Sequence, residues 1–144
     1  VTASCENCPA PIPDLVQVLT EAEVELLAQC QIDDVDLTLN INHTWINDIT
    51  TFDLTSPDGT TSQMFSGICG AEDNIMTILD DDAATPIGSV CPPTGFQRHT
   101  TQSGVGLDLF DGENPAGTWE LNILDTVGAD SGTLNDWTLD ITLR

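Results

Sequence analysis

The chain has 144 residues, 40 % of them hydrophobic, and carries 24 acidic side chains against two arginines and no lysine. The formal net charge of −22 excludes a nucleic-acid backbone as partner, because phosphate binding requires clustered cations. The hydrophobic content excludes a disordered acidic tail, and no apolar run approaches the length of a membrane span. The length fits one domain with a substantial core.

Two interpretations of the acidity are compatible. Most carboxylates form a solvated surface, and their mutual repulsion weakens the compact state, so salt or a divalent cation should favour folding. A few carboxylates bind Ca²⁺, which takes six to eight oxygen ligands. The sequence contains no EF-hand loop, so a calcium site has to be assembled from separate turns.

The five cysteines stand at positions 5, 8, 30, 69 and 91. Cys5 and Cys8 form a C-x-x-C in a proline-rich stretch without a helix to activate a thiol, which disfavours redox chemistry. Four zinc ligands at finger-like spacing are missing. Disulfides in an oxidising compartment fit better, and the odd count leaves one thiol free or paired outside this chain.

The first 30 residues carry two different patterns. Residues 1–14 contain three prolines and two cysteines and are interpreted as a linker that leads into the domain. Residues 15–30 are ambiguous. Thr20 and Glu23 resemble the capping box of a short helix, but the segment also fits two short alternating strands around a turn, at 16–18 and 24–26.

From Asp34 onward, apolar and polar residues alternate as in half-buried strands. Such segments occupy 34–42, the surroundings of Phe52 and Leu54, 63–65, 118–124 and 137–143. Ser56-Pro57-Asp58-Gly59 is a turn with proline at its second position. Short alternating segments separated by turn residues predict an all-β, antiparallel sandwich or jelly roll with almost no helix.

Four collinear blocks of the sequence resemble one known family. They are IDDVDLTLNINHTWINDI (32–49), LTSPDGT (54–60), CGAEDNIMTILDDDAAT (69–85), and FDGENPAGTWELNILD (110–125) continuing into DSGTLNDWTL (130–139). Together they are similar to the P domain, or Homo B domain, which accompanies subtilisin-like proteases such as the proprotein convertases. Asn47, Ile49, Leu79 and Asp82 depart from the family pattern conservatively, and residues 15–30 match it poorly.

The resemblance implies an antiparallel jelly-roll β-sandwich of about eight or nine strands over residues 15–144, and it favours strands over a helix in 15–30. It also implies a non-catalytic accessory domain of a secreted, bacterial protease or similar exoprotein. Such a domain supports the folding, stability or substrate handling of a catalytic domain in the same polypeptide. The absence of a basic, apolar leader at Val1 is expected of a mature fragment or of an excised domain.

The alternative function is an independent binding module for extracellular protein, for example collagen-like protein, or for polysaccharide. In that case Trp45, at a strand end, is the candidate ligand platform. No catalytic residue is expected in either case. The chain has no G-x-S-x-G motif, and only His43 and His99 could act as a base. A structural role suits His43 better, and among 24 acids a suitably spaced carboxylate pair carries no information.

Calcium is the expected cofactor. The densest carboxylates are Asp33, Asp34 and Asp36 at a strand start, and Asp73 with Asp80, Asp81 and Asp82 in one loop. Consecutive like charges repel one another unless a cation lies near them. The ligands are therefore expected among Asp34, Asp36, Asp73, Asp80 and Asp81.

A Cys69–Cys91 disulfide is expected to close a 22-residue separation and to hold the acidic loop to the sandwich. One of Cys5 and Cys8 is expected to pair with Cys30, although spacing does not fix the connectivity. Trp119 and Trp137 start two strands and are expected in the core, because each ring buries a large area.

Overall fold

Apolar and polar residues alternate most regularly in the two longest strands, β4 (Ile32–His43) and β10 (Gly132–Leu143). They pair antiparallel, from Gly132 opposite His43 to Leu143 opposite Ile32, and bury their apolar side chains on one face. This ladder is the centre of a computed structural model that describes residues 1–26 and 28–144. Leu27, part of the ambiguous segment 15–30, lies outside the described residues.

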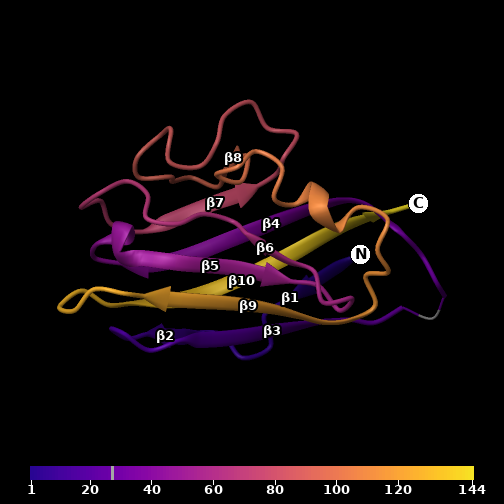
Figure 1. Ribbon diagram of the computed structural model, residues 1–144, viewed down its shortest axis with the longest axis horizontal. Coiled ribbons are helices and arrows are strands. Elements are labelled where there is room, and N and C mark those ends of the chain that lie inside the picture. The colour runs from indigo at the N-terminus through magenta and orange to yellow at the C-terminus, as the bar shows by residue number, and fades with distance from the viewer. Residues whose placement is uncertain (27) are drawn as a thin grey trace.

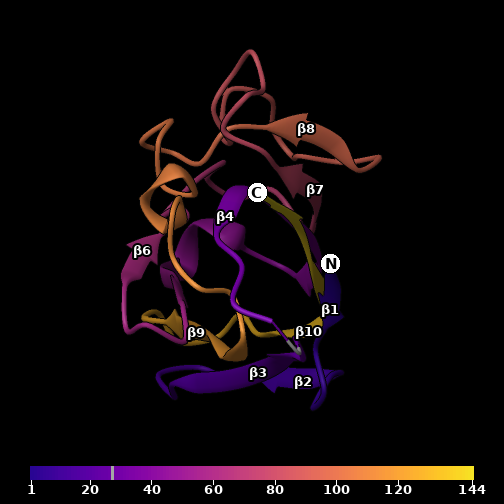
Figure 2. The same ribbon diagram turned by 90° about the vertical axis from the view of Figure 1, so that its right-hand side faces the viewer.

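Two sheets form the sandwich (Figures 1 and 2). The six-stranded sheet runs β1–β10–β4–β7–β8, and β2 pairs with β10 beside β1. The four-stranded sheet runs β3–β9–β5–β6. The remaining strands are β1 (Thr2–Ser4), β2 (Ala10–Ile12), β3 (Val18–Val24), β5 (Ile49–Thr55), β6 (Thr61–Gln63), β7 (Ile75–Leu79), β8 (Gln97–His99) and β9 (Gly117–Asp125).

This strand order is that of an eight-stranded jelly roll. β1 and β2 share one strand position beside β10, and β8 extends the edge by pairing parallel to β7. The part of the chain that the structure describes thus contains ten strands. Among the described residues, helical structure is limited to the 3₁₀ turns η1 (Ile46–Asp48) and η2 (Asp108–Phe110). The predicted all-β sandwich is confirmed. None of the described helices has the length and hydropathy required to cross a membrane.

Aromatic side chains fill the space between the sheets. Trp119 and Trp137 are fully buried, as predicted. Their indole N–H groups donate to the carbonyl of Pro115 (3.0 Å) and to Oγ1 of Thr20 (2.8 Å), so neither polar atom is left unpaired by burial. Phe52 stacks on Phe65 in the same core.

For the first 30 residues, one interpretation needs correction and one open alternative is resolved. The segment 1–14, interpreted as a linker, supplies β1 and β2, whose backbones pair with β10. For the segment 15–30, which local pattern left open, the described residues form one strand, β3, in agreement with the resemblance, which favoured strands over a helix; its bounds differ from the two short strands considered. Thr20 and Ala22 face the core in β3, and these weakly apolar residues hid the alternation. The hydroxyl of Thr20 accepts the Trp137 hydrogen bond and caps no helix.

The cysteine pairing is partly as predicted. Cys69 and Cys91 form the expected disulfide. The expected link between Cys30 and one of Cys5 and Cys8 was wrong, because Cys5 pairs with Cys8 and Cys30 is a free thiol. Cys5 and Cys8 stand in the short loop between β1 and β2, two segments that run in the same direction along β10, and this loop brings the two sulfurs together.

The sandwich has two long sides, and each side contains an edge of both sheets. β1 and β2 lie against β3 at one side of the sandwich, so the edge strands β6 and β8 lie at the opposite side (Figure 2). Long connections run over this second side, including the chain between β7 and β8 and the chain from β8 to η2 (Figure 1). The Cys69–Cys91 disulfide ties the connection before β7 to the connection after it.

We expect the Cys69–Cys91 disulfide to contribute about 3 kcal/mol to the free energy of unfolding, because it restricts a long loop in the unfolded chain. The paired Cys69→Ser and Cys91→Ser substitutions, made with Cys30→Ser to prevent exchange, should lower the denaturant midpoint accordingly. The paired Cys5→Ser and Cys8→Ser substitutions are the control, since their loop spans three residues and should contribute about half as much. Equal losses from both pairs would contradict this account.

Candidate functional site

A buried His–Asp pair lies where β4 and β9 end. His43 Nε2 lies 2.8 Å from Asp125 Oδ2, and both side chains are fully buried. The backbone N–H of Trp45 donates to His43 Nδ1 at 3.0 Å. An N–H donor leaves Nδ1 no proton of its own, so the ring is neutral and its Nε2–H donates to Asp125. Gly132 is required beside this pair, because a Cβ there would collide with the backbone of Asn42.

Three more carboxylates surround this pair. The carbonyl of Asp48 accepts the N–H of Thr126, the carboxylate of Asp14 accepts the N–H of Ala129, and Asp14 bridges to Asp125 through the backbone. Asp130 accepts the hydroxyl of Thr44. Burial, followed by the charges of Asp125 and Asp130, raises the pKa of Asp48. Asp14, Asp48, Asp125 and Asp130 are called the His43-end cluster below.

A second acidic cluster lies at the opposite end of β4. Arg98, from β8, binds Asp36 and Asp80, each at 2.7 Å, and these two carboxylates raise the pKa of the guanidinium. Burial and the charges of Asp36 and Asp80 raise the pKa of the neighbouring Asp34. The guanidinium of Arg98 thus supplies part of the positive charge that these crowded carboxylates need. This role of Arg98 was not predicted from the sequence.

The other expected calcium ligands do not join this cluster. Asp81 Oδ1 accepts the N–H and hydroxyl of Thr101, and Oδ2 accepts the N–H of Leu107, so this carboxylate organises the loop around it. Asp73 precedes β7 and Asp80 follows it. The expected single loop is therefore divided by a strand, and about 20 Å of extended chain separates the two residues.

None of the acidic clusters is a closed metal site. Among the described residues, only Cys5, Cys8 and Asp136 bring three candidate ligand atoms within 4.8 Å of one another. Both sulfurs of that group are joined in a disulfide, so it cannot hold a metal through thiolates.

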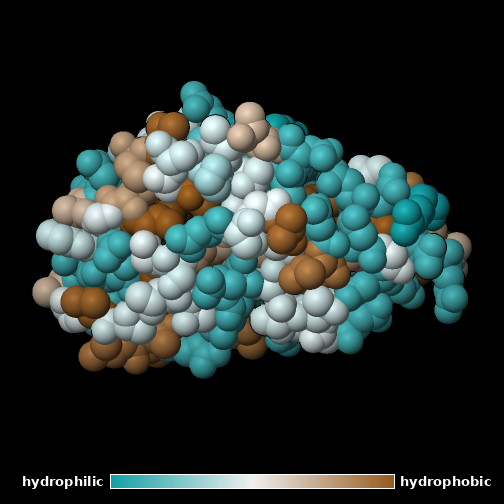
Figure 3. Space-filling view, turned by 45° about the horizontal axis from the view of Figure 1, so that its top comes forward, coloured by the Kyte–Doolittle hydropathy of each residue, from teal (hydrophilic) through white to brown (hydrophobic). Residues whose placement is uncertain are grey.

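The long side of the sandwich that contains β6 and β8 has a different character. Residues 59–71 and 83–107 contain no aspartate or glutamate; we call these two segments the acid-free face. They are joined by the Cys69–Cys91 disulfide and by the Ser62 hydroxyl, which donates to the carbonyl of Gly106 at 2.7 Å. In the space-filling view, white, tan and brown surface is extensive on this side (Figure 3).

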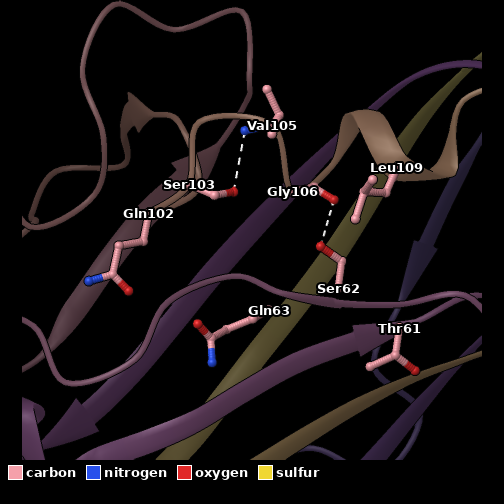
Figure 4. A pocket seen from close by; sticks show the side chains of 8 residues that line it. All are labelled: Thr61, Ser62, Gln63, Gln102, Ser103, Val105, Gly106 and Leu109. Carbon is pink, nitrogen blue, oxygen red and sulfur yellow. Dashed lines mark hydrogen bonds between the residues drawn. The ribbon is translucent and has the colours of Figure 1, made fainter.

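Two shallow grooves open on the acid-free face. A groove of about 400 Å³ lies between β6 and the segment after β8, where Gln63 and Gln102 face each other and Val105 and Leu109 stand on the far side (Figure 4). A second groove, of about 410 Å³, adjoins it through Gln102. No residue that lines either groove is charged. Val105 and Leu109 are each 55 % exposed.

Trp45, the candidate ligand platform, is 43 % exposed beside η1. Its backbone is fixed by the hydrogen bond to His43, and its ring is part of the surface at the His43 end. The second histidine, His99, is 3 % exposed, and its Nε2 is buried without a partner among the described residues. Both imidazoles of the chain are therefore inside the sandwich.

The His43-end cluster escaped the sequence reasoning because its members are scattered between positions 14 and 130. The available signal was weak: Asp48 and Asp125 each stand where a strand begins or ends, inside the quoted family blocks 32–49 and 110–125. The acid-free segments were a stronger signal, because 25 consecutive residues, 83–107, lack an acid in a chain that has 24.

The comparisons with known proteins agree on the fold. A family model described as the proprotein convertase P-domain matches residues 90–141, which include the last of the quoted blocks. The resemblance inferred from the sequence is confirmed over that range. No curated protein matches the chain.

Among solved structures, the chain is similar to a serine protease of Aeromonas sobria, with a TM-score of 0.57 and 15 % identity over 98 % of this chain. The complex of that protease with its chaperone ORF2 gives the same values. The chain spans 26 % of the length of the protease. At this identity the likeness establishes a shared fold.

The stability of the domain should fall as the pH rises from about 4 towards neutrality. Burial is the largest cause of a raised pKa at five carboxyl groups: Asp34, Asp48, Asp53, Asp108 and Asp111. A raised pKa in the folded state means that the folded chain holds these protons more tightly than the unfolded chain. The favourable contribution is present below the ordinary value of 3.8 and is lost as the pH rises through the folded pKa.

Melting at pH 4.5 and pH 7.5, at one ionic strength, measures this effect. We expect the higher melting temperature at pH 4.5. Repeating the pair in 0.5 M NaCl should reduce the difference in part, because salt screens the like charges but does not remove the burial effect. A higher melting temperature at pH 7.5 than at pH 4.5 would contradict the raised pKa values of these five carboxyl groups.

Proposed function

We propose that this chain, whose residues 90–141 match the proprotein convertase P-domain, is a non-catalytic accessory domain of a secreted bacterial protease. It packs on the catalytic domain of the same polypeptide and supports the folding and stability of that domain. The observation that carries the proposal is the acid-free face. The buried centre of a protein interface is depleted of charged residues. This face has no carboxylate and a single charged residue, Arg98, on a molecule with a net charge of −22.

The composition of the face suits a partner within the same chain. Its grooves are lined by uncharged polar residues and by exposed apolar side chains such as Val105 and Leu109. Interfaces between domains of one chain bury roughly 600–1,500 Å² and are more polar than obligate interfaces. A face that mixes serine, threonine and glutamine with valine and leucine can pack against such a partner and can remain soluble without it.

The burial of both histidines supports a non-catalytic role. A general base must lie within hydrogen-bonding reach of a substrate proton, but His43 is 1 % exposed and both of its ring nitrogens are engaged. His99 is equally enclosed. The two disulfides support an extracellular location, since such bonds persist in oxidising compartments.

Calcium stabilisation is part of the proposal, although three of the expected ligands already have partners within the chain. Arg98 already compensates Asp36 and Asp80, and the carboxylate of Asp81 holds three N–H or O–H donors. Asp34 is the member of the Asp34–Asp36–Asp80 group that Arg98 does not bind. A cation at this end would therefore have to compete with a guanidinium.

The second candidate function, a binding module for extracellular protein or polysaccharide, is favoured by Trp45. A tryptophan ring that is 43 % exposed can stack on a sugar or on a peptide. Binding of such a polymer that is lost in Trp45→Ala, without any effect of the acid-free face on the neighbouring domain, would favour this function over the first.

The docking proposal predicts that charge on the acid-free face weakens the full-length protein. Val105→Asp, on the face, and Leu109→Asp, in the wall of the groove that the face borders, each place a carboxylate on an exposed apolar position. On the chain alone they should therefore change the free energy of unfolding by only about 0.5 kcal/mol. In the full-length protease the same substitutions should lower the yield and the melting temperature of the catalytic domain, because an unpaired charge is then buried in the interface.

Leu19→Asp is the matched control, because Leu19 is similarly exposed (46 %) but lies in β3, on the opposite side of the sandwich from the face. It should leave the full-length protein unchanged. If the control and the face variants have equal effects, the docking proposal is wrong. The chain alone should hydrolyse neither peptides nor polysaccharides, and turnover above that of a heat-denatured sample would overturn the non-catalytic assignment.

A further inference from the structure

The edge strand β6 has one side without a neighbouring strand. The four-stranded sheet runs β3–β9–β5–β6, so β6 pairs with β5 alone. The backbone N–H of Met64 donates to the carbonyl of Phe52 in β5. Because the backbone groups of an antiparallel strand point to alternate sides, Ser62 also bonds to β5. The backbone N–H and C=O groups of Thr61 and Gln63 therefore point away from the sheet.

This open edge faces a groove. Among the described residues, no group forms a hydrogen bond with the backbone N–H or C=O of Thr61 or Gln63. Both residues are exposed, whereas Ser62 between them is buried. All three residues of β6 line the groove of about 400 Å³ that separates β6 from the segment after β8 (Figure 4). The groove therefore presents unpaired backbone donors and acceptors to whatever enters it.

Other edge strands of the sandwich carry devices that prevent pairing with a further strand. Proteins protect open edges with charged side chains or with proline. β3 carries Glu21 and Glu23, and the N–H of Glu21 already donates to the side chain of Asn7. β2 contains Pro11, and β8 contains Arg98. The sequence of β6, Thr-Ser-Gln, has neither a charge nor a proline, although 24 of the 144 residues are acidic.

We propose, on the basis of the docking proposed above, that an extended segment of the catalytic domain of the same polypeptide lies in this groove and adds to β6 as a further strand. Its backbone pairs with the two N–H and two C=O groups of Thr61 and Gln63. An extended chain is the ligand that offers acceptors and donors in the matching alternation. Thr61 and Gln63 lie about 7 Å apart along the strand, so a segment of about three residues covers them.

The charge of the chain favours an occupant from the same polypeptide. A second copy would bring another net charge of −22 towards the first, and molecules with such charges of one sign repel each other. A tethered segment needs no electrostatic attraction, because the covalent connection holds it at a roughly millimolar effective concentration. Few backbone hydrogen bonds are then sufficient for occupancy.

The lining of the groove indicates the composition of the segment. No lining residue is charged, so a charged side chain that enters the groove would be buried without a partner. Side chains of a strand point alternately to opposite sides. One of them would face Val105 and Leu109 on the far wall, and its neighbours would lie beside Thr61 and Gln63 at the surface. The segment is therefore uncharged, with an apolar residue between two small or polar residues.

Substitution of Gln63 tests the role of the backbone. Gln63→Pro removes an N–H that points away from β5, so the ladder between β5 and β6 is retained. Gln63→Ala is the matched control, because it removes the side chain and keeps the N–H. In the full-length protease, Gln63→Pro should lower the melting temperature of the catalytic domain about as much as Val105→Asp does. Gln63→Ala should leave it unchanged.

Amide hydrogen exchange tests the strand on the unsubstituted protein, so the result does not depend on how a variant folds. The N–H groups of Ser62 and Met64 are bonded to β5 and serve as the internal reference. In the full-length protease, the amides of Thr61 and Gln63 should exchange at least tenfold more slowly than in the 144-residue chain alone. The ratio for the reference amides should change little.

The outcomes separate strand addition from docking. If Val105→Asp weakens the full-length protein but Gln63→Pro does not, and Thr61 and Gln63 remain unprotected, strand addition is wrong and docking stands. If neither substitution has an effect and no protection is seen, both proposals are wrong. Protection of Thr61 and Gln63 in the chain alone, with a dimer in sedimentation, would replace the catalytic-domain segment by a second copy and overturn the assignment.

Discussion

The antiparallel ladder between β4 and β10 is the constraint on which the rest of the molecule depends. It joins the first third of the chain to the end of the chain, through two strands of twelve residues each. The two acidic clusters lie at its two ends. Because the side-chain period of a strand is two, a slip of one residue would turn Leu37, Leu39 and Ile41 out of the core. The same slip would remove His43 from Asp125.

The ladder also explains how one chain separates its charges. The start of β4 carries Asp34 and Asp36, and Arg98 reaches them from the edge strand β8. The end of β4 carries His43, which is neutral and serves as a hydrogen-bond bridge. Acidic side chains are therefore compensated at one end, left uncompensated at the other, and absent along the side where the two sheets expose β6 and β8.

Much of the fold could be predicted from the sequence, because strict alternation identifies strands whose inward residues are strongly apolar. This holds for β4, β9 and β10. It fails for β3, where Thr20 and Ala22 face the core, and for β7, whose acidic neighbours made it look like part of a loop. Proline-rich composition likewise hid β1 and β2, which are strands only because β10 offers them a partner edge.

The candidate sites were harder to predict, because they depend on which distant residues the fold brings together. Asp73 and Asp80 are close in sequence and far apart in space, whereas Asp14 and Asp125 are far apart in sequence and joined by a backbone bridge. The pairing of Arg98 with Asp36 spans 62 residues. Runs of acidic residues show where carboxylates are dense in the sequence. The topology of the sandwich decides which of them lie close together in space.

The uneven distribution of acids has a kinetic consequence. The summed field of an asymmetric charge distribution orients a protein before contact. A partner surface that is itself acidic is repelled from most of this molecule and least from the side made by residues 59–71 and 83–107. Encounters in which this side faces the partner are therefore the most frequent. The preference is strongest in dilute salt, where the electric field extends furthest. The acids thus govern the direction of approach even though they lie outside the place of contact.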